Sequence, residues 1–456
     1  MITTTNPATG EQIAEYSELD NDEIEAKLNL ADAAYRSWRE SPMEERTALL
    51  KALGGLYEEK QEDLAVLATR EMGKPITQAR SEVAKCASLF HYLAEAGPAM
   101  LEPRQWALSD GGRAEGRWLP QGAVLAVMPW NFPYWQVVRF LAPTILAGNV
   151  GLLKHASIVQ GVAKQLEDLV VEAGGPRGLF QNLCVSSDLI ADIIADQRVV
   201  AATLTGSEGA GSAVAAQAGK HLKKVVLELG GSDPFIVMPS ADIDQAVSDA
   251  VTARIQNNGQ SCICGKRTIV HADIYDDFSG KFIDALQAVK LGDPMEDDTE
   301  LGPLSSIEQR DTVLEQVEAA KREGARLLFG AEKLERDGAW MTAGLLSDVA
   351  VGSKTGTDEI FGPVGQIYRA QDIDDATRIA NAIPFGLGSA VWTNDEQERE
   401  HFANRIEAGM TTFNAVNGSK IEAPFGGIKR SGHGRELSEF GLHEFMNLKT
   451  IIYPAN

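Results

Sequence analysis

Short apolar runs that alternate with helix-like stretches from about residue 120 onward constrain the fold of this chain more than any other feature. The runs are rich in β-branched residues, as in AVLAVM (123–128), VVAATLT (199–205) and PFIVM (234–238). Stretches such as SIVQGVAKQLEDLVVEAG (157–174) lie between them and carry apolar residues at helical spacing. Strands that alternate with helices predict a mostly parallel sheet covered on both faces. A second such series follows residue 260, so we expect two α/β domains that divide near Gly230 and Gly231.

Residues 21–100 have a different apolar pattern from the rest of the chain. Their apolar residues recur at helical spacing, which predicts a helical segment. A chain of 456 residues is also long for one core, which favours more than one domain.

The net charge of the chain, −23, disfavours a nucleic-acid partner, since no basic patch is evident. No apolar run approaches the length of a membrane span, and the N-terminus lacks a secretory signal. We expect a cytoplasmic protein with no membrane partner.

Two cysteines one residue apart, Cys262 and Cys264, stand in the segment IQNNGQSCICGKR, which resembles an exposed turn. Four cysteines in so long a chain argue against a disulfide scaffold and fit a reducing compartment. A zinc site needs about four nitrogen or sulfur ligands, and this pair has no second pair and no nearby His, so we expect no metal. A nucleophile, a labile disulfide between the two and a quiet apolar Cys264 remain open at this point.

Five other stretches suggest chemistry, although each alone could be structural. They are MPWNFP (128–133), LLKHAS (152–157), LELGG (227–231), NNGQSC (257–262) and EIFGPV (359–364). Glu228 is the hardest to explain structurally, because burial in an apolar run would raise the pKa of its carboxyl toward that of a useful base. No Gly-x-Gly-x-x-Gly occurs, so a dinucleotide would have to bind by other means.

Taken together, the order and spacing of these stretches resemble the aldehyde dehydrogenase family over nearly the whole chain. The opening NPATGE, the 34-residue interval from Glu228 to Cys262, and the late segment PFGGIKRSGHGRE all match its pattern. The resemblance implies a Rossmann-like dinucleotide-binding domain (1–101 and 121–229) and a catalytic domain (230–439). It also implies a small β arm (102–120 and 440–456) that builds a homo-oligomer, either a dimer or a tetramer.

The resemblance also implies the chemistry. Cys262 would attack a small-molecule aldehyde as a thiolate and form a thiohemiacetal. Its oxyanion would be held by the side chain of Asn131 and the backbone N–H of Cys262. Loss of hydride would leave a thioester, which water activated by Glu228 would hydrolyse. A thiol hydrolase is the rival class, but it would leave MPWNFP and EIFGPV without a role, and Glu228 disfavours a CoA-acylating enzyme.

Coenzyme contacts follow from the same resemblance. The residues expected to bind it are Trp130, Asn131, Lys154, Ser157, Gly206, Ser207, Leu229, Glu359 and Phe361. Family members that prefer NAD often have Glu at the position of Ser157, where it repels a 2′-phosphate. We therefore expect NADP or NAD, with NADP used at least as well. His155 stands where Pro is usual and is interpreted as a packed or surface imidazole.

Within the family, the chain is most similar to succinate-semialdehyde dehydrogenases. Arg139 and the Cys-x-Cys pair both occur in that branch, whereas a second substrate-binding Arg is Gln256 here. The resemblance implies that Arg139 and Ser419 bind the substrate carboxylate. The alternatives are that Arg139 pairs with an acid inside the fold, and that the substrate is glutarate semialdehyde or an apolar aldehyde. Phe413 and Asn414 are expected to border the substrate tunnel.

Overall fold

Four helices precede the first long strand, as the periodicity of residues 21–100 predicts. The computed structural model describes residues 1–455. The helices are α1 (Asn21–Trp38), α2 (Met43–Glu59), α3 (Gln61–Met72) and α4 (Ile76–Met100). Helix α1 begins at a capping box, in which the Asp20 carboxylate accepts from the Glu23 N–H and the Glu23 side chain accepts from the Asp20 N–H. A hairpin of β1 (Ile2–Thr5) and β2 (Gln12–Tyr16) precedes them.

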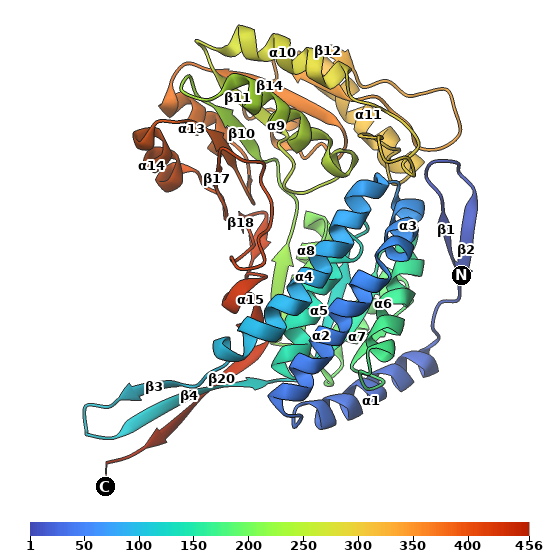
Figure 1. The fold of residues 1–456 in the computed structure, drawn as a ribbon, viewed down its shortest axis with the longest axis vertical. Helices are drawn as coiled ribbons and strands as arrows, with labels where there is room; N and C mark the ends of the chain where they lie inside the picture. Colours follow the sequence, from blue (N-terminus) through green and yellow to red (C-terminus); the bar gives the residue numbers. More distant parts are fainter. Residues whose placement is uncertain (456) are drawn as a thin grey trace.

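The first large sheet has six strands in the order β19-β9-β8-β5-β6-β7, and the helices cover its faces (Figure 1). Its strands are β5 (Ala123–Met128), β6 (Val150–His155), β7 (Phe180–Asn182), β8 (Val199–Thr205), β9 (Lys224–Glu228) and β19 (Gly432–His433). Its helices are α5 (Trp135–Ala147), α6 (Gln160–Glu172), α7 (Ile190–Ala195) and α8 (Glu208–Lys220). Strands β5 to β9 are parallel, as the alternating pattern predicts. Every residue of α5 is buried, so this helix lies in the core between α4 and the sheet.

The second sheet has seven strands in the order β12-β13-β14-β11-β10-β16-β17, and only β12 pairs antiparallel. Its strands are β10 (Pro234–Val237), β11 (Arg267–His271), β12 (Arg326–Gly330), β13 (Gly344–Ser347), β14 (Val364–Ala370), β16 (Ala390–Trp392) and β17 (Thr412–Phe413). Its helices are α9 (Ile243–Ile255), α10 (Tyr275–Gln287), α11 (Ile307–Arg322), α12 (Lys354–Thr357), α13 (Ile373–Asn381) and α14 (Glu396–Arg405). Two sheets with covering helices confirm the predicted α/β class.

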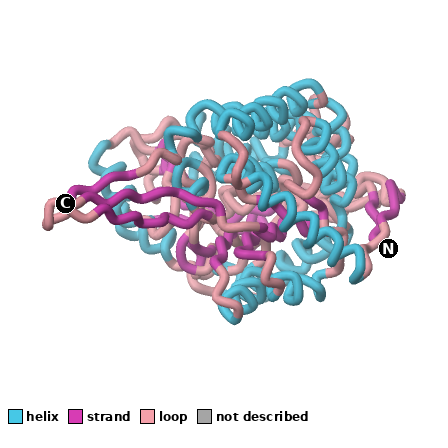
Figure 2. The backbone as a smooth tube through the Cα atoms, turned by 90° about the horizontal axis from the view of Figure 1, so that it is seen from below, coloured by secondary structure: helices cyan, strands magenta, loops and turns pink. Residues whose placement is uncertain are grey.

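A three-stranded antiparallel sheet projects from this body, with the C-terminus at its tip (Figures 1 and 2). It consists of β3 (Arg104–Ala107), β4 (Arg113–Pro120) and β20 (Met446–Tyr453). Its apolar side chains Trp106, Leu448 and Ile452 are exposed. We call this sheet the arm. No helix among residues 1–455 is long and apolar enough to cross a membrane.

The chain returns to the first sheet near its end, at a place that we expected to lie in the catalytic domain (230–439). Strand β19 pairs antiparallel with β9, and helix α15 (Ser438–His443) packs on α4 and α5. Gly432 has a φ of 111° and its Cα lies against the backbone of Leu227, where any side chain would collide. A two-residue strand carries no periodic signal, so the sequence pattern does not reveal this pairing. Two more short strands, β15 (Phe385–Gly386) and β18 (Ile428–Lys429), pair with each other.

Candidate active site

The loop that carries Cys262 is buried, which corrects the expectation of an exposed turn. Asn257, Asn258 and Gly259 are consecutive residues with positive φ, and none is exposed. Their left-handed backbone is of the kind that Asn and Gly tolerate best. The Asn258 amide donates to the carbonyls of Gly73 and Pro303 at 2.8 and 2.7 Å, and its oxygen accepts from a backbone N–H. The Asn258 side chain therefore anchors this loop to the backbone of two segments that are distant in sequence.

Two cavities meet at Cys262. The first, cavity A, has a volume of about 270 Å³ and the second, cavity B, about 560 Å³. The predicted coenzyme and catalytic residues that line cavity A are Trp130, Asn131, Gly206, Ser207, Glu228, Leu229, Cys262, Glu359 and Phe361. Cavity B is lined instead by α4 and α5 and by residues 417–419, and it contains the predicted substrate residues Arg139 and Ser419. Cys262 and Gln136 are the side chains common to both linings.

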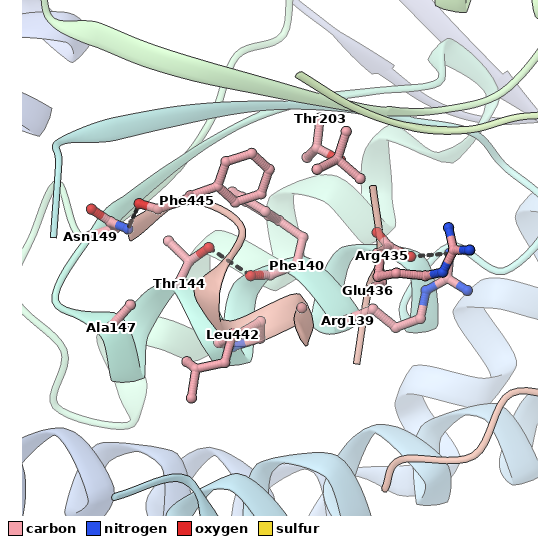
Figure 3. Close-up of a pocket in the computed structure, with 13 residues that line it drawn as sticks. Arg139, Phe140, Thr144, Ala147, Asn149, Thr203, Arg435, Glu436, Leu442 and Phe445 are labelled. Carbon is pink, nitrogen blue, oxygen red and sulfur yellow. Dashed lines mark hydrogen bonds and ion pairs between the residues drawn. The ribbon is translucent and has the colours of Figure 1, made fainter. Parts of the chain in front are cut away.

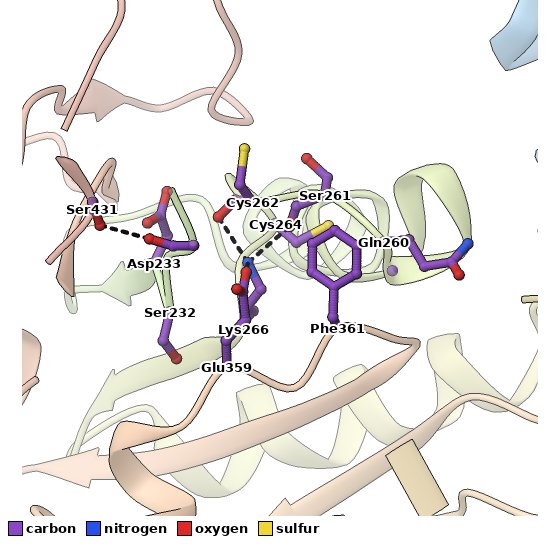
Figure 4. A network of polar contacts seen from close by, with 12 residues as sticks. Ser232, Asp233, Gln260, Ser261, Cys262, Cys264, Lys266, Glu359, Phe361 and Ser431 are labelled. Atoms are coloured by element: carbon purple, nitrogen blue, oxygen red, sulfur yellow. Dashed lines mark hydrogen bonds and ion pairs between the residues drawn. The ribbon is translucent and has the colours of Figure 1, made fainter. Parts of the chain in front are cut away.

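The backbone of Cys262 is fixed by Lys266, a residue that was not predicted from the sequence. The Lys266 ammonium donates to the carbonyls of Ser261 and Cys262 at 2.8 and 2.7 Å, and it pairs with Glu359 at 2.9 Å (Figure 4). Burial raises the pKa of the Cys262 thiol to about 12, although the positive charges of Lys266 and Arg139 oppose this shift. At neutral pH the thiol is therefore protonated, and its reaction as a nucleophile requires a base. Cys262 and Cys264 are free thiols, and Cys264 is fully buried.

Asn131 points its amide toward the cysteine loop. It follows β5 and is buried, and its Nδ2 donates to the carbonyl of Gln260 at 3.0 Å. Its Oδ1 accepts from Gln136 at 3.0 Å, which fixes the orientation of the amide. An amide nitrogen carries two N–H groups, so one donor of Asn131 remains for a ligand beside Cys262.

Glu228 ends β9 in cavity A and is almost completely buried. Neither carboxylate oxygen has a hydrogen-bond partner among the described residues. Burial raises the pKa of this carboxyl well above its ordinary value, and the negative charge of Glu436 adds to the effect. An unpaired carboxyl with a raised pKa suits a general base or acid.

The far wall of cavity A is aromatic. The rings of Trp130 and Phe361 meet edge to face, with centroids 5.7 Å apart. Glu359 lies so close to Gly230 that a Cβ there would come within 2.3 Å of its carboxylate. Gly230, directly after the Glu228-Leu229 pair, thus admits the Glu359 side chain to the cavity.

Gly206 and Ser207 stand at the start of the 13-residue helix α8, and the Ser207 hydroxyl accepts from the Ala210 N–H as its N-cap. Lys154 is buried at the end of β6, and burial lowers the pKa of its ammonium. It has no hydrogen-bond or ion-pair partner within residues 1–455, which leaves its charge for a ligand. Ser157 follows two residues after β6 and is exposed.

His155 is packed rather than exposed, which settles the two alternatives for this residue. It is 1% exposed, and its Nε2 lies 2.9 Å from the carbonyl of Pro133 while its Nδ1 accepts from the Ala156 N–H at 3.0 Å. Nδ1 also lies 3.2 Å from the Met128 carbonyl, but its shorter contact is with the Ala156 N–H, which favours the neutral tautomer with the proton on Nε2. The ring thereby ties β6 to the loop that contains Trp130 and Asn131.

Arg139 lies in α5 at the inner end of cavity B, but it is not free. Its guanidinium pairs with the Glu436 carboxylate at 2.7 Å, and both side chains are buried (Figure 3). It also stacks over the ring of Phe425, 4.6 Å from its centroid. Glu436 is thus an acidic partner of Arg139 inside the fold, which was the alternative to a role in substrate binding. A contact between Arg139 and a substrate carboxylate stays a prediction.

Ser419 lies in cavity B beside a cation, Lys85, that was not predicted from the sequence. Lys85 of α4 donates to the Ser419 carbonyl at 2.7 Å and to its Oγ at 2.8 Å, and Trp135 Nε1 donates to the same Oγ at 3.2 Å. No local motif marks Lys85, since its partner is 334 residues away in sequence.

Phe413 and Asn414 are not among the residues that line cavity B, and their place at the border of the substrate tunnel stays a prediction. Asn414 has a positive φ and binds the backbone of Thr393 through its side chain, and Phe413 packs against buried apolar side chains of the second sheet and its helices. Asn417 and Gly418 form that wall instead. Gln256 is in the lining, and its side-chain nitrogen is buried without a partner among the described residues.

A half-buried thiol between two cavities, with an amide donor and an unpaired carboxyl beside it, defines a cysteine-dependent enzyme on a doubly wound α/β scaffold. Residues 1–451 match the model of the aldehyde dehydrogenase family. The chain therefore belongs to the aldehyde dehydrogenase family, as its motifs predict, and the predicted fold class and enzyme class are confirmed.

The chain is also similar in sequence and in structure to individual members of this family. The chain is 49% identical over 452 residues to the NADP(+) succinate-semialdehyde dehydrogenase 1 of Mycobacterium tuberculosis, with 99% of both chains covered. It is 48% identical to the NADP(+) succinate-semialdehyde dehydrogenase of Mycobacterium leprae, again over 99% of both. The structure is similar to that of succinic semialdehyde dehydrogenase from Streptococcus pyogenes in complex with NADP+, with a TM-score of 0.98, 37% identity and complete coverage of both chains.

Proposed function

We propose that this protein oxidises succinate semialdehyde to succinate and uses NADP in preference to NAD. The observation that supports this most directly is the position of Cys262, which opens on one side to cavity A and on the other to cavity B. A reaction that joins a coenzyme and an aldehyde at one sulfur needs such an arrangement. The names of the relatives agree with this substrate and coenzyme.

Glu228, Cys262 and Asn131 have separate roles in the proposed reaction. Glu228 accepts the thiol proton, and the Cys262 sulfur attacks the aldehyde carbon to give a thiohemiacetal. The free N–H of Asn131 and the backbone N–H of Cys262 hold the oxyanion, and one such donor contributes about 3–4 kcal/mol. Once the thioester has formed, Glu228 releases the thiol proton to solvent and can act as a base again. It then takes a proton from the water that attacks the thioester, and the expelled Cys262 sulfur takes this proton back as the acid product leaves.

The walls of cavity A fit a dinucleotide. The nicotinamide ring accepts hydride when it is bound, and Trp130, Leu229 and Phe361 would enclose it while Glu359 binds its ribose. The N-terminus of α8, with Gly206 and Ser207, suits the pyrophosphate. Lys154 has an unpaired buried charge, and with the Ser157 hydroxyl it fits a 2′-phosphate, whereas a Glu at position 157 would repel it.

Cavity B supports a substrate that ends in a carboxylate. Arg139, Ser419 and Lys85 place two cations and a hydroxyl in its lining. We assign Arg139 and Ser419 to the end of the substrate remote from the aldehyde, and the four-carbon length of succinate semialdehyde suits this arrangement.

The arm suits a homo-oligomer, a dimer or tetramer, of a cytoplasmic enzyme. Its exposed apolar side chains on a sheet with open edges favour burial against a second copy. Light scattering coupled to size-exclusion chromatography measures the mass in solution, and a monomer would contradict this assignment.

Absorbance at 340 nm tests the reaction. Purified protein is mixed with succinate semialdehyde, glutarate semialdehyde or butanal, each with NADP and with NAD. Succinate semialdehyde with NADP should give the highest kcat/KM. Equal kcat/KM values for butanal and succinate semialdehyde would contradict the proposed substrate, and strict use of NAD would contradict the proposed coenzyme.

A further inference from the structure

The two cations in cavity B differ in what already neutralises them. Arg139 is paired with Glu436, so together they contribute almost no net charge. Lys85 has no carboxylate within ion-pair distance among residues 1–455. Glu82, one turn earlier on α4, is ion-paired with Lys74 and accepts from the N–H groups of Tyr134 and Trp135. Lys85 is therefore the uncompensated positive charge of the lining.

The hydrogen bonds between Ser419 and its neighbours leave one donor of Ser419 and one donor of Lys85 without an acceptor among the described residues. Its Oγ accepts from Lys85 and from Trp135, which occupies both lone pairs, so its own proton must be donated to a third group. No described residue accepts it. An ammonium has three N–H groups, and Lys85 uses two of them on Ser419. A hydroxyl donor and an ammonium donor side by side, both without an acceptor, match the two oxygens of a carboxylate.

The position of Lys85 is fixed by its surroundings. It lies 4.4 Å from the centroid of the Trp135 ring, a cation–π contact that holds the ammonium over the cavity wall. Thr77, Gln78, Ser81, Glu82 and Lys85 all line cavity B, and their spacing puts them on one face of α4. Burial and the charge of Arg139 lower the pKa of Lys85 to about 8, and at neutral pH the ammonium remains largely charged.

We propose that Lys85, together with the Ser419 hydroxyl, is the determinant of selectivity for an aldehyde that carries a carboxylate. The proposal rests on the proposed function and adds to it the residue that supplies the net charge. Arg139, whose charge Glu436 already satisfies, then shapes the end of the cavity and contributes less to the charge selection.

Lys85→Met tests this assignment, because it keeps much of the side-chain volume and removes the charge. We expect kcat/KM for succinate semialdehyde to fall about 10- to 100-fold, mainly through KM, since a hydrogen bond to a charged group has about that effect. Butanal, a neutral aldehyde of the same length, should keep its kcat/KM within about twofold. Lys85→Arg, which retains the charge, should recover a large part of the loss for succinate semialdehyde.

Lys51→Met is the matched control, because it removes the same charge from an exposed lysine of α2 that does not line cavity B. It should leave both aldehydes unchanged. Equal losses on both aldehydes in Lys85→Met, or no loss on either, would overturn the assignment. If that variant does not fold, Lys85→Gln is judged by the same ratio of the two aldehydes. A wild-type enzyme that shows no preference between the aldehydes would instead refute the proposed function, which separates the two failures.

Discussion

The buried imidazole of His155 predicts a specific loss of stability in acid. Its Nε2 proton is donated to Pro133 O and its Nδ1 accepts from the Ala156 N–H, so a second proton on Nδ1 would break the bond from Ala156 and gain only the Met128 carbonyl at 3.2 Å. Burial lowers its pKa from 6.5 to about 4. Between these values the unfolded chain binds more protons than the folded one, so stability is full above pH 6.5 and falls as the pH drops toward 4.

The magnitude follows from the two pKa values. At pH 5 the linkage amounts to about 2 kcal/mol of unfolding free energy, and it approaches about 3 kcal/mol below pH 4. His155→Gln keeps an amide N–H for Pro133 O and cannot be protonated. The difference in unfolding free energy between pH 8 and pH 5 should therefore be about 2 kcal/mol smaller in His155→Gln than in the wild type.

Urea denaturation followed by tryptophan fluorescence at the two pH values measures this difference. His91→Gln, at an exposed histidine, serves as the control and should keep the wild-type difference. If His155→Gln loses as much stability as the wild type between pH 8 and pH 5, the imidazole is not held neutral in the fold. Because His155 ties down the loop of Trp130 and Asn131, His155→Ala should also raise KM for the coenzyme in the 340 nm assay at pH 8.

Three further predictions concern the chemistry. Cys262→Ala should abolish oxidation while Cys264→Ala keeps most of it, as measured at 340 nm; the opposite result would identify the other thiol as the nucleophile. Glu228→Gln should slow hydrolysis of the thioester more than its formation, so stopped-flow absorbance should record a burst of reduced coenzyme and then a slow phase, and a steady rate without a burst would contradict this role. Ser157→Glu should lower kcat/KM for NADP about 10- to 100-fold and largely spare NAD, because a carboxylate repels the 2′-phosphate; equal effects on both coenzymes would rule out a contact with that phosphate.

Local sequence patterns predicted the parallel strands of the two sheets and the motifs that meet in cavity A. Runs such as VVAATLT and PFIVM became parallel strands, because β-branched residues in short apolar runs suit a doubly covered sheet. The motifs around Glu228 and Cys262 predicted that these side chains belong together, and both line cavity A. The two-residue strand β19 was missed, because two residues have no periodicity.

The residues that sequence reasoning missed depend on contacts between distant segments. Lys85 and Ser419 are 334 residues apart, and Glu436 comes from a segment far from Arg139. Nothing near Lys85 in sequence distinguishes it from a lysine on the solvent face of an amphipathic helix. The burial of the cysteine loop was also unforeseen, because Asn-Asn-Gly has the composition of an exposed turn and becomes buried only when distant carbonyls accept its amides.

The burial of Asn258 has a consequence for the chemical lifetime of the enzyme. Asn followed by Gly is the dipeptide in which an unfolded chain loses ammonia most readily, and Asn is among the thermolabile residues. In the fold both ends of the Asn258 amide are engaged, by Gly73 O and Pro303 O at its nitrogen and by the Gly302 N–H at its oxygen. Conversion to Asp would set a carboxylate against two carbonyl oxygens beside the catalytic loop. Each excursion to the unfolded state therefore exposes this site to irreversible ageing, and whatever keeps the loop folded also protects the covalent structure of the chain.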